Sequence, residues 1–204
     1  MLAVAAWLSV AAAAPPGGLY EVRQMEIGGA LELSKNGRFR YALTYGALDE
    51  QASGRWSFDG KVVRLTTEPA PRSAKFELIA DEPAPPGTLS MQLDDRADDW
   101  GAPLSAVANP NSAAPFEIRA GGDGQVDLSG LPAVTAIAPL IPVFGPSGDV
   151  FPISPGRGHR LRFRFHPNDL GTAALTDEPL SVGTDGVLTL KRYDTSIRFF
   201  RERP

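Results

Sequence analysis

The sequence predicts an all-β protein in which an antiparallel meander, forming a partial barrel, is followed by a β-sandwich. In residues 19–67 apolar side chains fall on alternate positions between tight-turn sequences, which is the period of a strand. The chain holds 21 Gly and 19 Pro, and both residue types weaken helix interiors. No stretch has a convincing helical period, so any helix is expected to be short, within residues 103–108.

The composition is that of a folded protein with an acidic balance. Hydrophobic residues make up 43% of the 204 residues and charged residues 22%, which is too apolar for a disordered chain. A net charge of -4 argues against nucleic acid as a partner, because phosphate binding needs a basic surface. Cysteine is absent, so disulfides and a lipid anchor on an N-terminal cysteine are both excluded.

The N-terminal segment predicts export. Residues 1–14 are an apolar run that ends in alanines, as in a secretory signal peptide, with cleavage expected at residues 12–14. The run is too short to span a bilayer, which takes about 20 apolar residues. No Lys or Arg precedes it, and the alternative is an apolar first strand of the fold. We therefore expect a periplasmic or secreted protein without a membrane span.

Two hairpins follow in the meander, residues 15–80. The first turns at the Lys-Asn-Gly sequence of residues 35–37, and the second turns at residues 59–60, Asp-Gly. Apolar residues alternate with polar ones on both sides of each turn, so that one face of the sheet is apolar. The alternating apolar positions are Leu31, Leu33, Phe39, Tyr41, Leu43, Tyr45, Trp56, Phe58, Val63 and Leu65.

A domain boundary is predicted after a further short strand at residues 76–80. Residues 81–87, Asp-Glu-Pro-Ala-Pro-Pro-Gly, have the composition of a semi-rigid linker. The sandwich would then occupy residues 88–204. The alternative is one continuous barrel in which this segment is a long loop.

The second half contains further alternating segments, at residues 89–93, 116–119, 126–128, 161–165, 187–190 and 197–201. Residues 131–155 are apolar but are interrupted by prolines at positions 132, 139, 142, 146 and 152. Since proline donates no hydrogen bond to a ladder, extended edge segments and a loop are expected there rather than a central strand.

The meander resembles the half-barrel of lipocalin-like and heat-shock-lipoprotein-like bacterial envelope proteins, in which a glycine and an aromatic residue recur at turns and strands. The resemblance rests on the sequences of residues 18–20 (Gly-Leu-Tyr), 29–33 (Gly-Ala-Leu-Glu-Leu), 36–39 (Asn-Gly-Arg-Phe) and 54–56 (Gly-Arg-Trp). It implies a fold and an envelope location, and no catalytic residue.

Residues 87–131 are similar to the prealbumin-like sandwich of carboxypeptidase-regulatory domains. The shared features are a first strand, an acidic loop, a Gly-x-Pro-Leu turn at residues 101–104 and an Asp-Gly turn at residues 123–124 that leads into a strand. The resemblance implies a prealbumin-like or immunoglobulin-like sandwich, and a role as an accessory, non-catalytic module.

Enzyme signatures are missing from the chain. Neither a nucleophile elbow nor a phosphate-binding or dinucleotide-binding loop occurs. Neighbouring carboxylates such as Asp49 and Glu50 point apart on a strand, and His159 and His166 would lie on opposite faces. The acidic loop, residues 94–99, lacks the spacing of a calcium loop and favours a solvated turn. We expect no catalytic residue, no metal and no cofactor.

A row of arginines is the strongest candidate for binding. Arg160, Arg162 and Arg164 occupy one face of a predicted strand, and Trp100 beside the acidic loop is suited to stacking on a sugar. Guanidinium groups match the carboxylates and phosphates of anionic glycans or lipid headgroups. The alternative role of these arginines is cross-strand pairing with carboxylates and protection of a sheet edge.

The sequence therefore predicts a non-enzymatic, exported envelope protein that acts as a binding or structural module. Binding of an anionic glycan or lipid headgroup through the arginine face is one alternative, and a hydrolase with an unrecognised site is another. The apolar segment 136–153 is an alternative contact edge for an envelope protein partner, unless it only covers the sandwich.

Overall fold

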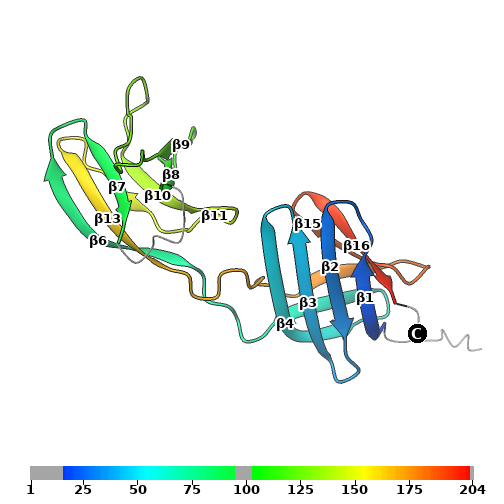
Figure 1. The fold of residues 1–204 in the computed structure, drawn as a ribbon. Helices are drawn as coiled ribbons and strands as arrows, with labels where there is room; N and C mark the ends of the chain where they lie inside the picture. The colour runs from blue at the N-terminus through cyan, green and yellow to red at the C-terminus, as the bar shows by residue number, and fades with distance from the viewer. Residues whose placement is uncertain (1–15, 95–102, 203–204) are drawn as a thin grey trace, which may run out of the picture. The chain divides into compact units, whose positions relative to one another are not determined.

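The computed structural model describes residues 16–94 and 103–202, and all regular structure in these ranges is β-strand (Figure 1). The all-β prediction is confirmed. The predicted signal peptide, Trp100 and most of the acidic loop lie outside the described residues. Within those ranges no helix is long and apolar enough to cross a membrane.

The chain forms two compact units. The first unit combines the N-terminal part up to Pro71 with the C-terminal part from Gly171 onward, and the second consists of Arg72–Leu170. The second unit is thus an insertion within the first. Each unit has its own hydrophobic core.

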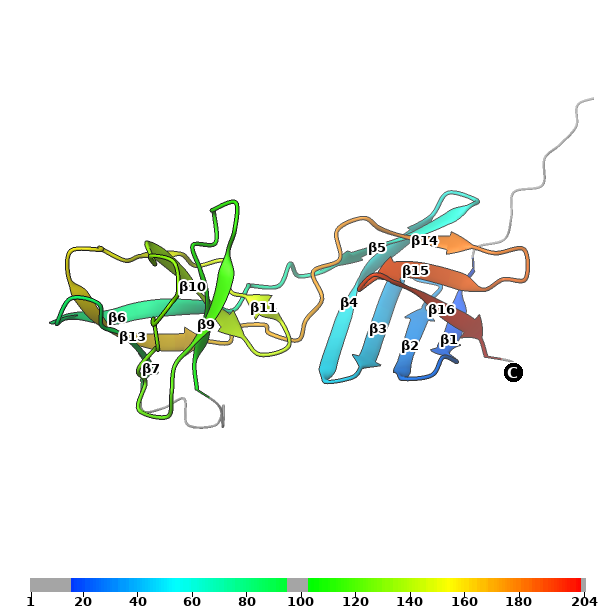
Figure 2. The ribbon, with the colours of Figure 1, turned by 90° about the horizontal axis from the view of Figure 1, so that it is seen from above.

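In the described residues the first unit is a closed antiparallel barrel with the strand order β1-β16-β15-β14-β5-β4-β3-β2 (Figures 1 and 2). Closure leaves no free edge, so that every strand has two neighbours. The strands are β1 (Gly18–Val22), β2 (Ile27–Leu33), β3 (Arg38–Tyr45), β4 (Leu48–Phe58), β5 (Val62–Thr67), β14 (Glu178–Val182), β15 (Leu188–Arg192) and β16 (Thr195–Arg201).

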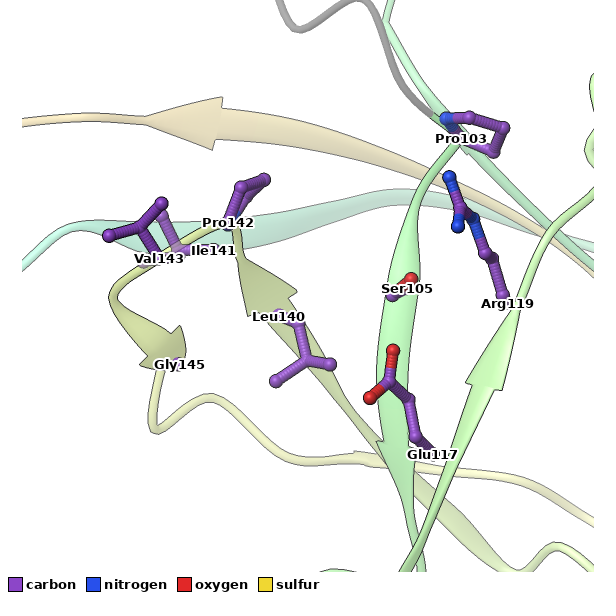
Figure 3. A pocket seen from close by; sticks show the side chains of 9 residues that line it. All are labelled: Pro103, Ser105, Glu117, Arg119, Leu140, Ile141, Pro142, Val143 and Gly145. Carbon is purple, nitrogen blue, oxygen red and sulfur yellow. The ribbon is translucent and has the colours of Figure 1, made fainter. Parts of the chain in front are cut away.

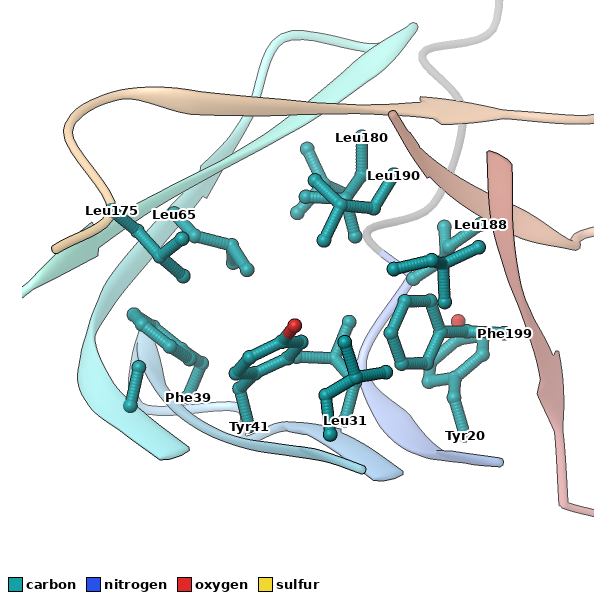
Figure 4. Packing of buried hydrophobic residues seen from close by; sticks show 14 of the residues in the cluster. Tyr20, Leu31, Phe39, Tyr41, Leu65, Leu175, Leu180, Leu188, Leu190 and Phe199 are labelled. Carbon is teal, nitrogen blue, oxygen red and sulfur yellow. The ribbon is translucent and has the colours of Figure 1, made fainter. Parts of the chain in front are cut away.

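Side chains fill the barrel interior. On β3, Phe39, Tyr41 and Leu43 are buried while the residues between them are exposed, as the alternation predicts. Figure 4 shows Phe39 and Tyr41 facing leucines from the opposite wall, together with Tyr20 and Phe199. Both predicted hairpins are confirmed, since β2 pairs with β3 and β4 pairs with β5.

The predicted domain boundaries are wrong. Strands β14, β15 and β16 close the barrel, although their residues were predicted to belong to a sandwich at residues 88–204. The decisive contact is the pairing of β5 with β14, in which Leu65 lies opposite Glu178. Alternation shows which face of a strand is buried but not which distant strand lies beside it.

The second unit contains two sheets in its described part. One has the order β6-β13-β7, and the other is a five-stranded sheet with the path β11-β10-β8-β9 and with β12 beside β10. Both sheets contribute residues to a single core. The strands are β6 (Lys75–Ala84), β7 (Leu89–Leu93), β8 (Ser105–Ala108), β9 (Phe116–Arg119), β10 (Ala136–Ile141), β11 (Gly145–Pro146), β12 (Phe151–Pro152) and β13 (Gly158–His166).

The prediction of a linker at residues 81–87 is also wrong, because the first half of this segment is the end of β6. Pro83 lies opposite His159 of β13. The strand tolerates this proline because β6 is at the edge of its sheet, where one side of the backbone needs no hydrogen bond.

Two expectations for the inserted unit need correction as well. The short helix expected within residues 103–108 is strand β8, paired with both β9 and β10. Residues 136–141 form β10, which has neighbours on both sides, although edge segments were expected. Its Pro139 lies between the two short strands that flank it, since β12 pairs with Ala136–Ile137 and β11 with Leu140–Ile141.

Candidate functional site

The predicted arginine row lies on the exposed face of β13. Arg160, Arg162 and Arg164 are exposed, while Leu161 and Phe163 between them are buried in the core of the inserted unit. The prediction that they share one face is confirmed.

A shallow groove of about 280 Å³ crosses this face. Two of the three predicted arginines line it, and we call it the arginine groove. Its lining residues come from β6, β7, β13 and the loop after β9, and are Ala80, Glu82, Ser90, Gln92, Gln125, Arg160, Leu161 and Arg162.

The arginines of this region differ in their ion pairs. The Arg164 guanidinium donates to Asp94 Oδ2 from Nε at 3.1 Å and from Nη2 at 2.8 Å. These hydrogen bonds raise the pKa of Arg164. Arg157 pairs with Asp81 through both carboxylate oxygens. In contrast, Arg160 and Arg162 have no ion pair with any described residue.

The polar lining of the groove is held by a turn. Gln92 Nε2 donates to the backbone carbonyl of Asp123 at 3.0 Å. The backbone N–H of Gln125 donates to Asp123 Oδ1, also at 3.0 Å. Gly124 has φ +81°, and a Cβ there would lie 2.5 Å from Gln92 Cγ, so the close approach of this turn to β7 requires glycine.

The only carboxylate of the described lining is Glu82. Its Cα pairs with that of Arg160 in the ladder between β6 and β13, yet the two side chains form no ion pair. The groove thus offers two guanidinium groups, two amide side chains and one carboxylate.

Four lining residues were not predicted from the sequence: Glu82, Ser90, Gln92 and Gln125. Glu82 belongs to the segment interpreted as a linker, so its position opposite Arg160 in the ladder was not predicted. Ser90 and Gln92 alternate with apolar residues on β7, and this was the available signal. What alternation does not show is that β7 lies parallel to β13, with Arg162 opposite Gln92.

The two histidines lie on opposite faces of β13, as expected. His166 is on the exposed face and contacts Glu77, with Nε2 2.8 Å from Oε2. His159 is buried, with Nδ1 2.9 Å from Asp81 Oδ1, and its Nε2 accepts a hydrogen bond from the Ser154 amide at 3.1 Å. Both ring nitrogens of His159 are therefore engaged by the fold itself.

A buried carboxylate lies inside the barrel. Asp49 is exposed and Glu50 is buried, so the neighbouring carboxylates do point apart. Glu50 Oε1 accepts from the Tyr41 hydroxyl at 2.6 Å, and Oε2 accepts from the Tyr193 hydroxyl at 2.5 Å and from Arg192 Nη2 at 3.1 Å. Burial and the hydrogen bond to Glu50 raise the pKa of both tyrosines, so they remain donors.

In the part of the chain that the structure describes, no three histidine or carboxylate side chains are grouped so that they could hold a metal ion. The chain was also compared with known proteins. No family model, no curated protein and no solved structure matches it, so its chemistry is argued from the geometry above.

Proposed function

We propose that the protein is a non-enzymatic binding module of the cell envelope, whose inserted unit binds an anionic saccharide in the arginine groove. The observation that supports this most is the difference among neighbouring arginines. Arg157 and Arg164 are each neutralised by a carboxylate, while Arg160 and Arg162 line a groove without an ion pair in the described residues.

The remaining groups of the groove suit a sugar. Amide side chains such as Gln92 and Gln125 both donate and accept hydrogen bonds, and sugar hydroxyls need both, whereas Ser90 is largely buried beneath the groove. A carboxylate or sulfate on the ligand fits the planar guanidinium fork of Arg160 or Arg162. The Glu82 carboxylate can accept a hydrogen bond from a sugar hydroxyl. Its negative charge repels a ligand that carries several negative charges close to it.

A hydrolase is the less favoured alternative. The pairing of Asp81 with His159 is of a type used in catalysis, but a general base needs a free nitrogen within reach of a substrate. His159 Nε2 is bonded to the backbone of Ser154 inside the fold. This arrangement supports a structural role for the pair.

The envelope assignment and the finer fold types belong to the same proposal. Export is supported by the apolar residues 1–14, which resemble a secretory signal peptide. The shared core of the two sheets in Arg72–Leu170 supports a prealbumin-like sandwich for the inserted unit, in place of residues 88–204. The lipocalin-like resemblance is proposed for the barrel alone.

The proposal is tested by calorimetric titration with oligogalacturonate, with neutral malto-oligosaccharide as the comparison ligand. We expect saturable binding of the acidic ligand that weakens as salt rises, because exposed charges are screened. The double variant Arg160→Gln/Arg162→Gln should lose about tenfold or more in affinity.

Arg164→Gln is the matched control, since it removes a charge from the same strand face that is already paired with Asp94. Affinity that is unchanged in the double variant, or at high salt, would reject the groove as the site. Vesicles containing phosphatidylglycerol form a separate arm: binding to them alone, abolished in the double variant, would identify a lipid headgroup in place of the saccharide.

A further inference from the structure

A second pocket, of about 370 Å³, lies elsewhere on the inserted unit (Figure 3). It shares no lining residue with the arginine groove. Strands β8, β9 and β10 and the turn between β10 and β11 form it. Its lining residues are Pro103, Ser105, Glu117, Arg119, Leu140, Ile141, Pro142, Val143 and Gly145.

One side of the pocket carries two opposite charges. Glu117 and Arg119 are two residues apart on β9, so that their side chains share the exposed face. Ser105 of β8 lies opposite Arg119, and Figure 3 shows it between the two charged side chains. Glu117 and Arg119 form no ion pair with each other, and neither forms one with another described residue.

The other side of the pocket is apolar and includes an unusual turn. The Phe144 amide donates to the Ile141 carbonyl at 3.1 Å, with Pro142 and Val143 between them. Proline followed by a residue of positive φ is the pattern of a type II turn, whose third position favours glycine. Here that position is Val143, with φ +70° and a side chain that is 57% exposed.

A valine at this position is unfavourable for the stability of the turn for two reasons. A β-branched residue strains the left-handed conformation, and its exposed side chain gains nothing from burial. Strained residues of this kind cluster at ligand contacts. The chain therefore keeps an apolar wall beside Glu117 and Arg119 where the turn itself would favour glycine.

We propose that this pocket binds a small zwitterion with an apolar side chain, as in an apolar amino acid or a short apolar peptide. Arg119 would bind the carboxylate and Glu117 the ammonium group, while Leu140 and Val143 would contact the side chain. The volume lies near the lower end of the range for small-molecule sites, about 300–1,000 Å³.

The test is calorimetric titration of the full chain with leucine and, as a separate arm, with trileucine; whichever binds more tightly identifies the source. Glycine keeps both charges without the side chain, and isovalerate keeps the side chain with only one charge. We expect saturable binding that is at least about tenfold weaker for glycine and isovalerate. Equal affinity for glycine would reject the apolar wall.

Three variants link such binding to the pocket. Glu117→Gln removes one charge at nearly constant shape, Arg119→Gln replaces the guanidinium group by a shorter neutral side chain, and Val143→Gly suits the turn while removing the apolar contact. Each should weaken binding about tenfold with an unchanged circular dichroism spectrum. Arg40→Gln, on the barrel surface, is the control and should have no effect.

The proposal fails if neither leucine nor trileucine binds with a Kd below about 10 mM. It also fails if the double variant Glu117→Gln/Arg119→Gln binds as well as the unchanged protein.

Discussion

At the scale of single residues, Glu50 is the centre of a polar network inside the barrel. A buried carboxylate is costly unless it is paired and hydrogen-bonded. Here Tyr41, Tyr193 and Arg192 together occupy both of its oxygens. Tyr193 reaches it from a two-residue turn in which it and Asp194 both have positive φ, at 55° and 54°. This strained turn therefore brings Tyr193 into contact with Glu50 on β4, a strand in a different wall of the barrel.

We therefore expect Glu50→Gln to destabilise the barrel by about 2–3 kcal/mol, because Arg192 keeps a largely buried charge without its counterion. Urea denaturation, followed by near-ultraviolet circular dichroism of the buried tyrosines, measures the change.

Asp49→Asn is the matched control, since this neighbouring side chain is exposed on the same strand. Its effect should stay within about 0.5 kcal/mol. Equal destabilisation by both substitutions would show that the network around Glu50 contributes nothing particular to stability.

At the scale of elements, Asp81 joins three segments of the inserted unit. It lies on β6, pairs with Arg157 before β13, and contacts His159, which in turn binds Ser154. Partial burial alone raises the pKa of Asp81, but the hydrogen bonds from Arg157 and His159 outweigh this and hold the pKa below its ordinary value of 3.8.

The sign of the pH dependence follows from this lowered pKa. The unfolded chain binds a proton at Asp81 more readily than the folded one, so the contribution to stability is present above about pH 4 and is lost as pH falls through the lowered pKa. Asp81→Asn should reduce stability near neutral pH and flatten the acid limb of the profile.

Urea denaturation between about pH 3 and pH 6 measures the two profiles, and Asp127→Asn provides the control. The pKa of Asp127 is also lowered, but by hydrogen bonds from Ser129 within one turn. Asp127→Asn therefore removes a carboxylate of lowered pKa that joins no separate segments, whereas Asp81→Asn removes one that does. An acid limb that is as steep in Asp81→Asn as in the unchanged protein would contradict the prediction.

At the scale of the whole molecule, the barrel is complete without the inserted unit. The two ends of the barrel segments meet where Thr67 donates from its amide to the Leu175 carbonyl at 2.9 Å and from its hydroxyl to the Ala173 carbonyl at 2.7 Å. These bonds lie within the barrel unit on both sides of the insertion.

A chain in which Arg72–Leu170 is replaced by a short Gly-Ser linker should consequently fold cooperatively, since the closed sheet and its core are both retained. A chain that stops before β14 should not, because β1 and β5 then each lose one of their two neighbours and the barrel stays open. Amide hydrogen exchange of β2 and β3 compares the two. Protection that survives the truncation would show that the N-terminal meander is stable by itself.

The arginine row shows how far a sequence pattern extends toward a site. Alternation was sufficient to place Arg160, Arg162 and Arg164 on one exposed face, because side-chain direction in a strand depends only on position along the chain. Which of them is neutralised depends on Asp94, which comes from the end of another strand. Opposite charges far apart in sequence pair only after the sheets are assembled.

The sequence was sufficient to predict the all-β class, the hairpins around residues 35–37 and 59–60, and the buried faces of the strands, because each of these depends on neighbours within a few residues. It was not sufficient to predict that β14, β15 and β16 return to close the barrel, or that residues 81–84 belong to a strand and not to a linker. The physical reason is that a ladder is formed between backbones, whose donors and acceptors are the same in every strand, so the choice of a distant partner depends on how whole faces pack.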